Sequence, residues 1–222
     1  MIKVENIEVA GLEHAVRGAR NPMSSWAKSD SDYDVANFCD SDFHIGDNDM
    51  ALLNRLFKAG VEHRTYARMI YVWMDITAPL YWWKEMDRYG VGKSQVSTST
   101  MHKIHAKEFE LNDFSHEHLI FGDFDEENYQ LHYDGIGTLA RIVVALNEFR
   151  IMYLETKDKK WWWQMIQLLP SSYNQKRTIC MSYEVVFKII KERTGHKLDE
   201  WRTFVEILKA LPYVKEIMGE VE

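Results

Sequence analysis

A polar stretch near the middle of the chain carries side chains that suit the binding of an anion or a heterocyclic ring. Residues 90–100, GVGKSQVSTST, contain five hydroxyl side chains and Lys93, and they are bordered by Arg88, His102 and His105. Hydroxyls, backbone amides and a lysine can all donate hydrogen bonds to a phosphate group or to the edge of a base. A generic turn-rich loop has much the same composition. The sequence therefore predicts a polar loop here and leaves open whether that loop binds a ligand.

His102 and His105 also raise the alternative of a metal site. They are three positions apart, so they would lie on one side of a helix, as metal ligands sometimes do. The sequence has no Cys-x-x-Cys pair, no His-Glu-x-x-His, no Gly-rich phosphate loop and no Gly-x-Ser-x-Gly element. Without a carboxylate or cysteine in a matching frame, we predict that the chain holds no metal ion.

Two rigid elements are predicted to position the polar stretch. The Tyr, Ile, Val and Trp content of residues 64–76 favours a strand, although the spacing would also tolerate a helix. Pro79 suits the first turn of the following helix, residues 78–89, because its missing N–H would have no partner there. Gly90 and Gly92 then end this helix. A loop held between rigid elements is a frequent place for small-molecule binding.

The rest of the chain is predicted to be mostly helical, with a strand at its start. Residues 2–9 largely alternate apolar and polar side chains, which is the period of a half-buried strand. Polar, turn-rich composition predicts loops over residues 28–49 and 112–135. Apolar residues at the helical period, with Gly or Pro as stops, predict the helices. These cover residues 11–21, 49–60, 135–157, 160–170, 182–195 and 198–211, with Asp47, Asn48 or Asp49 as the N-cap of the second.

Composition predicts one globular domain. No internal repeat, low-complexity tract or flexible linker divides the chain, so residues 1–222 are predicted to form a single domain. A content of 46% apolar and 13% aromatic residues is enough to bury a core. The predicted fold class is α+β, a helix-dominated domain with a small mixed or antiparallel sheet.

Net charge and cysteine content restrict the partners and the compartment. A net charge of -7 argues against a nucleic-acid polymer as the main partner, since duplex binding depends on Lys and Arg contacts to phosphate. A local basic pocket for one nucleotide stays compatible with that charge. Cys39 and Cys180 allow at most one disulfide, and the N-terminus lacks the layout of a signal peptide. No apolar run reaches the roughly 18 to 20 residues that span a bilayer, so we expect a cytoplasmic protein with no membrane partner.

Two clusters of adjacent tryptophans need a separate explanation. Trp82-Trp83 and Trp161-Trp162-Trp163 lie on predicted helices, where neighbouring residues cannot all point into one core. Trp offers a broad rigid surface with one N–H donor, which suits a subunit interface or the stacking of a flat ring. Core packing, an interface and ring stacking all stay open for these residues.

Taken in order, these pieces resemble the flavin-dependent thymidylate synthases. In that family a His-x-Ser/Thr-x-x-Glu element precedes an Ile-Ser-Arg turn, a helix ends in Gln-x-x-Arg-His-Arg, and a loop with Ser, Asn-Glu and Ser-x-Arg-Tyr follows. Downstream come a Leu-Pro step, a Thr-x-Asn-x-Arg helix with a later Arg, and an Ala-Gln-x-Glu-Ile-Arg helix. The counterparts, spread over about residues 48–210, are His63 to Arg68, Ile76-Thr77, Trp83 to Arg88, Ser99 to His102, Leu169-Pro170, Cys180 to Glu184 with Arg193, and Leu198 to Arg202.

The resemblance implies roles for a small set of residues. Two match positions that approach the flavin, and the others match or neighbour positions that hold the pyrimidine nucleotide. Arg88 matches the last arginine of the signature and Arg193 an arginine that binds the pyrimidine, so these two are the predicted catalytic residues. The flavin residues are His63 and Thr65, and the nucleotide residues are Arg88, Lys93, Ser97, Ser99 and Arg193.

The chain departs from the family's pattern at several charged positions. The replaced cations would neutralise a nucleotide phosphate, which carries close to two charges near neutral pH, and would support reduction of the flavin. Their loss removes charge-assisted hydrogen bonds, and nearby lysines could compensate. Met86 and Asp87 replace the first Arg and the His of the signature, Met101 the loop arginine, Ile166 the arginine before Leu-Pro and Arg68 the acidic residue, while Lys84, Lys93 and Lys103 are the candidates for compensation.

Two functions are therefore predicted. The first is a divergent protein of this family that binds a dUMP-like pyrimidine nucleotide and FAD between the subunits of a homotetramer. If it is catalytic, the family mechanism implies methyl transfer to the uracil ring, with methylenetetrahydrofolate and reduced nicotinamide as the further cofactors. The alternative is a non-catalytic oligomeric protein that keeps the fold for binding or support.

Overall fold

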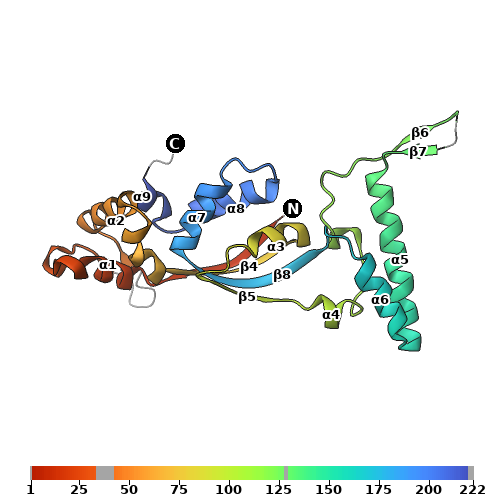
Figure 1. Ribbon diagram of the computed structural model, residues 1–222, viewed down its shortest axis with the longest axis horizontal. Helices are drawn as coiled ribbons and strands as arrows, with labels where there is room; N and C mark the ends of the chain where they lie inside the picture. The colour runs from red at the N-terminus through yellow and green to blue at the C-terminus, as the bar shows by residue number, and fades with distance from the viewer. Residues whose placement is uncertain (1, 34–42, 128–129, 220–222) are drawn as a thin grey trace. The chain divides into compact units, whose positions relative to one another are not determined.

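The computed structural model describes residues 2–33, 43–127 and 130–219, and Cys39 lies outside these ranges. The described chain is a helix-dominated α+β fold with a small antiparallel sheet (Figure 1), which confirms the predicted fold class. Its residues group by contact into two compact units, so the single domain stays a prediction. Unit 1 consists mainly of Ile76–Arg88 and Val96–Arg177, and unit 2 consists of Val4–Asp75, Tyr89–Gln95 and Thr178–Glu222.

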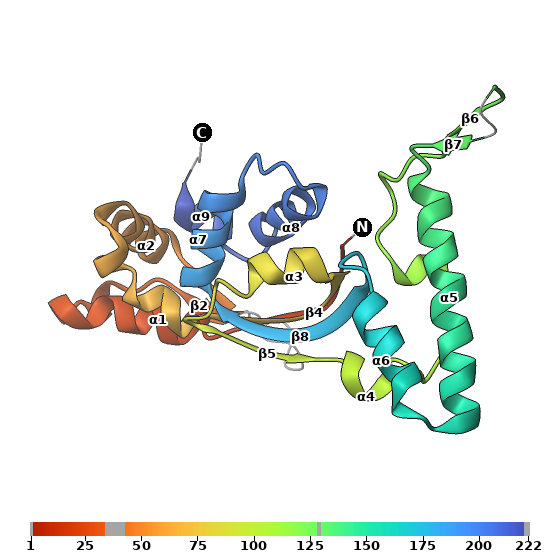
Figure 2. The same cartoon turned by 45° about the vertical axis from the view of Figure 1, so that its right-hand side comes forward.

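Four strands form the main sheet, in the order β1-β4-β8-β5 (Figure 2). They span Lys3–Ala10 (β1), Tyr71–Pro79 (β4), Asn174–Ser182 (β8) and Lys93–Ser97 (β5). Strand β4 alternates exposed and buried residues over its first half, which is the pattern of a sheet with one covered face. The predicted opening strand is confirmed as β1.

Unit 2 joins its N-terminal helices through a buried ion pair. Nε of Arg20 donates to Oδ1 of Asp49 at 2.7 Å, and the two side chains are 7% and 1% exposed. The first helix ends at Arg20, directly before Asn21-Pro22, as predicted. The helices of this unit are α1 (Leu12–Arg20), α2 (Asp47–Ala59), α7 (Tyr183–Arg193), α8 (Asp199–Lys209) and α9 (Val214–Met218), and β2 (Asp32–Tyr33) pairs antiparallel with β3 (Phe43–His44).

The carboxylate of Asp49 collects hydrogen bonds from a second segment as well. Its Oδ2 accepts the hydroxyl groups of Ser29 and Ser31, each at 2.6 Å, and the backbone N–H of Asp30 at 3.1 Å. Burial opposes ionisation, but the bonds from Ser29, Ser31 and Arg20 outweigh it and hold the pKa of Asp49 below its ordinary value. Since a buried charge is costly without its partners, this network fixes the segment before β2 to α2.

Unit 1 contains a pair of packed helices, α5 (Gly135–Thr156) and α6 (Lys159–Leu168), which lie side by side in both Figure 1 and Figure 2. The side chain of Asp134 caps α5 by accepting the N–H of Gly137. The buried core of these helices consists of Ile104, Phe109, Phe114, Leu139, Val143, Leu146 and Met165. The other elements are α3 (Leu80–Met86), α4 (Thr100–Lys103), the 3-10 helix η5 (Leu111–Asp113) and the antiparallel hairpin of β6 (Asp123–Asp125) and β7 (Gln130–His132).

Strands lie in four places where the sequence predicts loop or no element, and the first is the short β2–β3 pair within the predicted loop 28–49. The polar stretch contains strand β5, which ends the sheet order and has mostly exposed residues. An edge strand with polar side chains resists pairing with other chains, but it lacks the apolar alternation that reveals a strand. Strand β8 was missed because its first half, NQKR, is polar. The β6–β7 hairpin lies inside the acidic segment predicted as a loop.

Three predicted boundaries are also wrong. Helix α3, predicted over residues 78–89 with Pro79 in its first turn, runs over Leu80–Met86 with Pro79 as its N-cap. The segment 64–76 divides, because Thr65–Met69 forms the 3-10 helix η4 and the strand begins only at Tyr71. Helix α2 has Gly46 as its N-cap and no side-chain cap. The predicted cap Asp49 serves instead as the buried acceptor described above.

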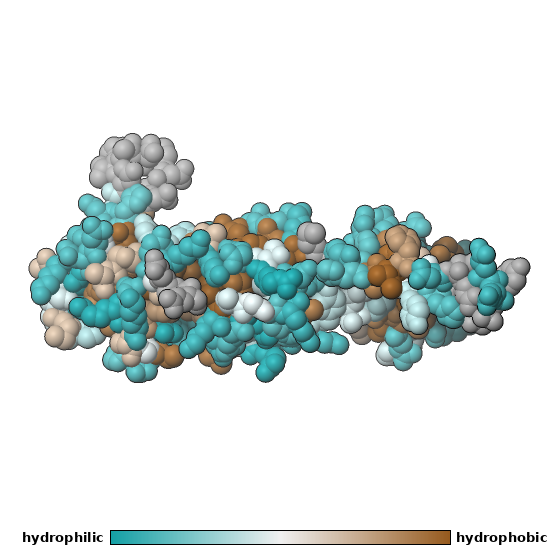
Figure 3. Space-filling model, turned by 90° about the horizontal axis from the view of Figure 1, so that it is seen from above, coloured by the Kyte–Doolittle hydropathy of each residue, from teal (hydrophilic) through white to brown (hydrophobic). Residues whose placement is uncertain are grey.

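The surface seen in Figure 3 is mainly hydrophilic, as expected for a globular protein. Hydrophobic residues lie on this face in separate small areas. Within the described ranges, no helix combines the length and the apolar character needed to cross a bilayer.

Candidate functional site

Arg193 is held in one orientation by two aromatic residues of unit 2. It is the last residue of α7, and its Nε donates to the phenol oxygen of Tyr89 at 2.9 Å. Its guanidinium carbon lies 4.6 Å from the ring centre of Trp201, which is fully buried. A guanidinium stacked on an indole keeps its donors in a fixed plane. This arginine is therefore oriented before any ligand arrives.

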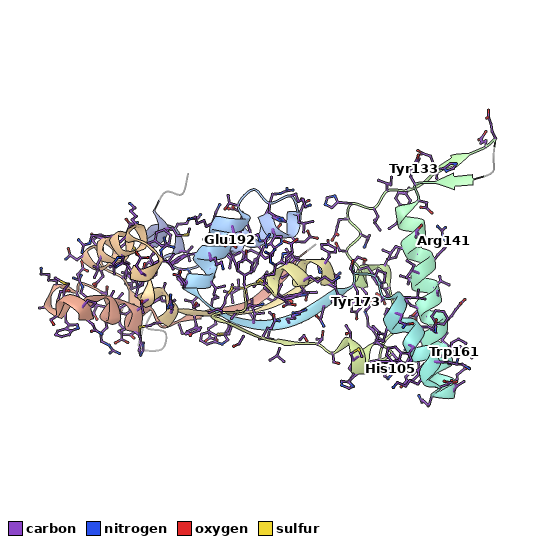
Figure 4. The ribbon with its side chains drawn as sticks, viewed as in Figure 1. His105, Tyr133, Arg141, Trp161, Tyr173 and Glu192 are labelled. Carbon is purple, nitrogen blue, oxygen red and sulfur yellow. The ribbon has the colours of Figure 1, made fainter. Side chains whose placement is uncertain are left out.

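Tyr89 connects Arg193 to an acidic neighbour. Its hydroxyl donates to Oε2 of Glu192 at 2.8 Å while accepting from Arg193 (Glu192 is labelled in Figure 4). Burial, followed by the bond to Glu192, raises the pKa of Tyr89. The phenol therefore stays neutral near physiological pH and can donate and accept at once.

The start of the polar stretch packs against the other end of α7. The backbone oxygen of Gly92 accepts the N–H of Ser182 at 3.0 Å. Gly92 has φ +79, and a Cβ there would lie 3.1 Å from Ser182 Oγ and from Val185 Cγ2. Only glycine fits this close approach without strain. Lys93 follows directly, with its Nζ 2.9 Å from Oε1 of Gln95.

His63 and Thr65 lie on two short 3-10 helices of unit 2, η3 (Val61–His63) and η4. Both side chains are exposed. Arg64 between them is committed to the fold: its Nε and Nη2 donate to the backbone oxygen of Phe57 at 3.0 and 2.8 Å. The segment therefore presents His63 and Thr65 outward from a fixed backbone.

Glu184, in the first turn of α7, has an unusual environment. Its Oε2 is buried and has no hydrogen-bond partner in the part of the chain that the structure describes. Burial raises the pKa of Glu184, while the positive charges of Arg64 and Arg68 act in the opposite direction. In the family resemblance this position holds an arginine, so a buried acceptor was not expected here.

In unit 1, Asp87, the residue before Arg88, is held by Arg177. Arg177 was not among the predicted site residues. Nη1 of Arg177 donates to Oδ1 of Asp87 at 2.8 Å, and its Nε donates to Oε1 of Gln175 at 2.9 Å. The guanidinium carbon lies 4.3 Å from the ring centre of Trp83. Arg88 itself has an exposed side chain.

The same network reaches the predicted nucleotide serines. Nε2 of Gln175 donates to the backbone oxygen of Thr98 at 2.9 Å, which fixes the residue between Ser97 and Ser99. The hydroxyl of Ser99 caps α4 by accepting the N–H of His102 at 3.0 Å, so its own O–H remains available as a donor. Arg177 and Gln175 thus link Asp87, the residue before Arg88, to Thr98, the residue between Ser97 and Ser99.

The predicted site residues fall in both units. Arg88, Ser97 and Ser99 belong to unit 1. Lys93, Arg193, His63 and Thr65 belong to unit 2, and their roles stay predictions. The contacts above add residues that sequence reasoning missed, because their partners are distant in the chain. These are Trp83, Tyr89, Gln175, Arg177, Glu184 and Trp201.

The two histidines at the end of the polar stretch, His102 and His105, are the residues that raised the alternative of a metal site. His105, which is labelled in Figure 4, packs edge-on against Tyr153 at 5.0 Å between ring centres, and its Nδ1 is buried without a partner among the described residues. No group of three or more His, Cys, Asp or Glu side chains suited to a metal occurs in the described ranges.

The tryptophan clusters divide between core and surface. Trp82 and Trp83 are both fully buried, so the expectation that adjacent tryptophans cannot share a core is wrong for α3. In α6, Trp161 stacks on Phe149 at 6.0 Å, and Trp163 is 42% exposed. Only the second cluster leaves a ring at the surface.

No protein-family model matches this chain, and no curated protein matches it either. Solved structures do match its fold. Two crystal structures of Thymidylate Synthase X (ThyX) from Helicobacter pylori, both with FAD and dUMP, have TM-scores of 0.64 and 0.65 at 18% and 19% identity. They cover 99% and 98% of this chain, and 98% of each of those chains is covered in turn. The UMP/dUMP methylase PolB from Streptomyces cacaoi, bound with 5-Br UMP, has a TM-score of 0.63 at 15% identity over 97% of this chain and 92% of its own.

These likenesses define the fold. The architecture is α+β, and more particularly it is a ThyX-like α+β fold over nearly the whole chain.

Proposed function

We propose that this protein binds a dUMP-type pyrimidine nucleotide together with FAD, and that its reaction is methylation of the uracil ring. The observation that carries the proposal is the match, over nearly the full length of the chain, to ThyX structures with FAD and dUMP and to a UMP/dUMP methylase with 5-Br UMP. The fixed orientation of Arg193 adds local support.

The proposed nucleotide residues have complementary donors. Arg193 orients the pyrimidine, because its planar donors match the oxygen atoms of a uracil edge. Arg88 and Lys93 supply positive charge, while the hydroxyls of Ser97 and Ser99 donate hydrogen bonds. Arg88 and Arg193 are the proposed catalytic residues.

The segment from His63 to Arg68 fits a flavin dinucleotide. His63, Thr65 and Arg68 have exposed side chains that provide donors and a positive charge for a diphosphate. The Oε2 of Glu184, which has no hydrogen-bond partner among the described residues, supplies an acceptor for an N–H or O–H group. A bound flavin would supply the hydride chemistry, with methylenetetrahydrofolate and reduced nicotinamide as further cofactors.

A second candidate is a non-catalytic binding protein with the same fold. The observation that favours it is the burial of Met86, which is fully enclosed where the resemblance expects the first arginine of the signature. The neighbouring Asp87 is neutralised by Arg177. Both family cations are therefore replaced by groups that serve the fold.

We further propose that the protein works in the cytoplasm as a homotetramer. Exposed apolar side chains on the α5–α6 pair, such as Val144, Ile151 and Trp163, would be covered in an assembly. Light scattering of the purified protein measures the mass of the assembly and thereby tests the tetramer.

Copurified flavin distinguishes the two functions. A yellow protein with absorbance in the flavin band, stabilised against heat by FAD and by dUMP, is the expected result. A colourless protein whose melting temperature responds to neither ligand would overturn the proposal and favour the non-catalytic candidate.

A further inference from the structure

Arg177 is a charged residue on an otherwise buried side of strand β8. Gln175 is 7% exposed, and Ile179 and Met181 on the same side are 1% and 0% exposed. The side chain of Arg177 is itself only 12% exposed. Burying a charge is costly unless it is paired, and replacing a buried ion pair with apolar residues of similar volume is often neutral or stabilising. Its presence here therefore calls for a function.

The guanidinium of Arg177 is fixed on three sides. Asp87 binds Nη1, Gln175 binds Nε, and the ring of Trp83 lies against its face. Gln175 is in turn held by Trp83, whose indole N–H donates to the backbone oxygen of Gln175 at 2.9 Å. This arrangement removes the rotamer freedom that an arginine normally loses on binding a ligand.

One edge of the Arg177 guanidinium is not used by the described part of the fold. Nη2 makes no hydrogen bond within the described residues, and it is not among their enclosed polar atoms. An arginine has five N–H donors in one plane, and a pair of them can bind two oxygens of a phosphate or carboxylate. The pinned guanidinium is thus a preformed half of an oxyanion site.

We propose that Arg177 binds the phosphate group of the nucleotide, and that Asp87 is the positioning residue that holds its guanidinium. The inference rests on the proposed nucleotide function. It explains how a phosphate is bound although Met86, Met101 and Ile166 stand where the family resemblance expects arginines. A phosphate at Arg177 would lie next to the Asp87–Arg88 turn, which already carries a predicted nucleotide residue.

Asp87 provides a second test, in which the expected change in phosphate affinity is opposite to that of an Arg177 variant. Its carboxylate fixes Arg177 but also repels a phosphate, because its side chain is 44% exposed beside the proposed site. Asp87→Asn keeps an acceptor for Nη1 and removes the negative charge. Affinity for a dianionic ligand should therefore rise in this variant, whereas it should fall in Arg177→Gln.

The test is calorimetric titration of the full-length protein with dUMP and with deoxyuridine, which differ only by the phosphate. We expect Arg177→Gln to weaken dUMP binding by about tenfold or more, as for the loss of one charge-assisted contact, and to leave deoxyuridine binding unchanged. Arg177→Lys should fall between the two, since it keeps the charge without the planar fork. Arg141→Gln, at an exposed arginine of the same unit, is the matched control and should change neither. Asp87→Asn should tighten dUMP binding a fewfold.

An unchanged ratio of dUMP to deoxyuridine affinity in both Arg177 variants would overturn the proposal while leaving the nucleotide function intact. If the unmodified protein binds neither compound, the proposed function fails, and inorganic phosphate becomes the probe. At matched ionic strength, phosphate should then raise the melting temperature of the unmodified protein and of Arg141→Gln more than that of Arg177→Lys. Equal shifts in all three would reject the oxyanion site itself. Circular dichroism of each variant checks that it is folded. If Arg177→Gln does not fold, Arg177→Lys is used for the test in its place.

Discussion

Arg193 at the end of α7 and Tyr89 are joined by a hydrogen bond of 2.9 Å across 104 positions of sequence. This contact ties the segment after Arg88 to the helix that ends in the predicted pyrimidine-binding arginine. It also makes the phenol of Tyr89 a shared group, because the same oxygen donates to Glu192.

Tyr89→Phe removes the acceptor that orients Arg193 while keeping the aromatic packing. We expect nucleotide affinity to fall by about three- to tenfold, since a hydrogen bond contributes roughly 0.5–1.5 kcal/mol. Calorimetric titration with dUMP measures the change. Tyr153→Phe is the control, as its ring packs against His105 and its hydroxyl has no hydrogen bond within the described residues. Equal affinities for the two variants would contradict the orienting role.

Gly92→Ala should lower the stability of the protein, because φ +79 disfavours any side chain and the new Cβ would press on Ser182 and Val185. Strain of this kind costs on the order of 1–3 kcal/mol. Gly90→Ala is a close control, because a Cβ at Gly90 meets no atom within 4 Å. Chemical denaturation compares the two. Similar free energies of unfolding would show that the Gly92 contact is not tight.

Asp49→Asn should destabilise the protein by about 3–5 kcal/mol, the usual result of breaking a buried ion pair. Glu206→Gln, at an exposed ion pair with Lys209, should change stability by less than about 1 kcal/mol. Denaturation curves at neutral pH check both values. A loss below about 1 kcal/mol for Asp49→Asn would contradict the importance of this network.

The pH dependence of the Asp49 variant follows from its lowered pKa. A carboxylate with a depressed pKa in the folded state stabilises fully above its unfolded pKa of about 3.9 and loses this contribution as the pH falls through the folded value. The difference between Asp49→Asn and the unmodified protein should therefore shrink below about pH 4. Stability measured from pH 7 downward tests this, and a difference that grows in acid would reverse the assigned sign.

Glu184→Gln should act in the opposite direction. Because burial raises the pKa of Glu184 in the folded state, the ionised form costs stability once the pH exceeds the unfolded pKa of about 4.3. The glutamine variant should be at least as stable as the unmodified protein at pH 7, and the advantage should vanish in acid. Thermal unfolding at several pH values measures it. A less stable variant at neutral pH would mean that the carboxylate is satisfied in the folded protein.

The long helices were predictable because their apolar residues repeat at the helical period and glycine or proline marks many of their ends. Strands β5 and β8 were not, since the first is a polar edge strand and the second begins with polar residues. Periodicity reports burial on one face, and these segments show too little of it. The predicted fold class was nevertheless correct, because the helices determine it.

The candidate site was predictable only in part. The resemblance pointed to Arg88 and Arg193, but nothing in the sequence indicated that Tyr89 or Trp201 would hold the second. Arg177 was equally hidden, because a lone arginine between polar neighbours gives no sign of stacking on Trp83. Contacts between distant segments decide these roles, and local patterns do not contain them.

The most direct test of the central claim is titration of dUMP into the FAD-saturated protein. We expect saturable binding of dUMP that is strongly weakened in Arg193→Ala and kept in the exposed-arginine control Arg141→Gln. Absence of binding to the folded, FAD-treated protein, or equal binding by both variants, would contradict it.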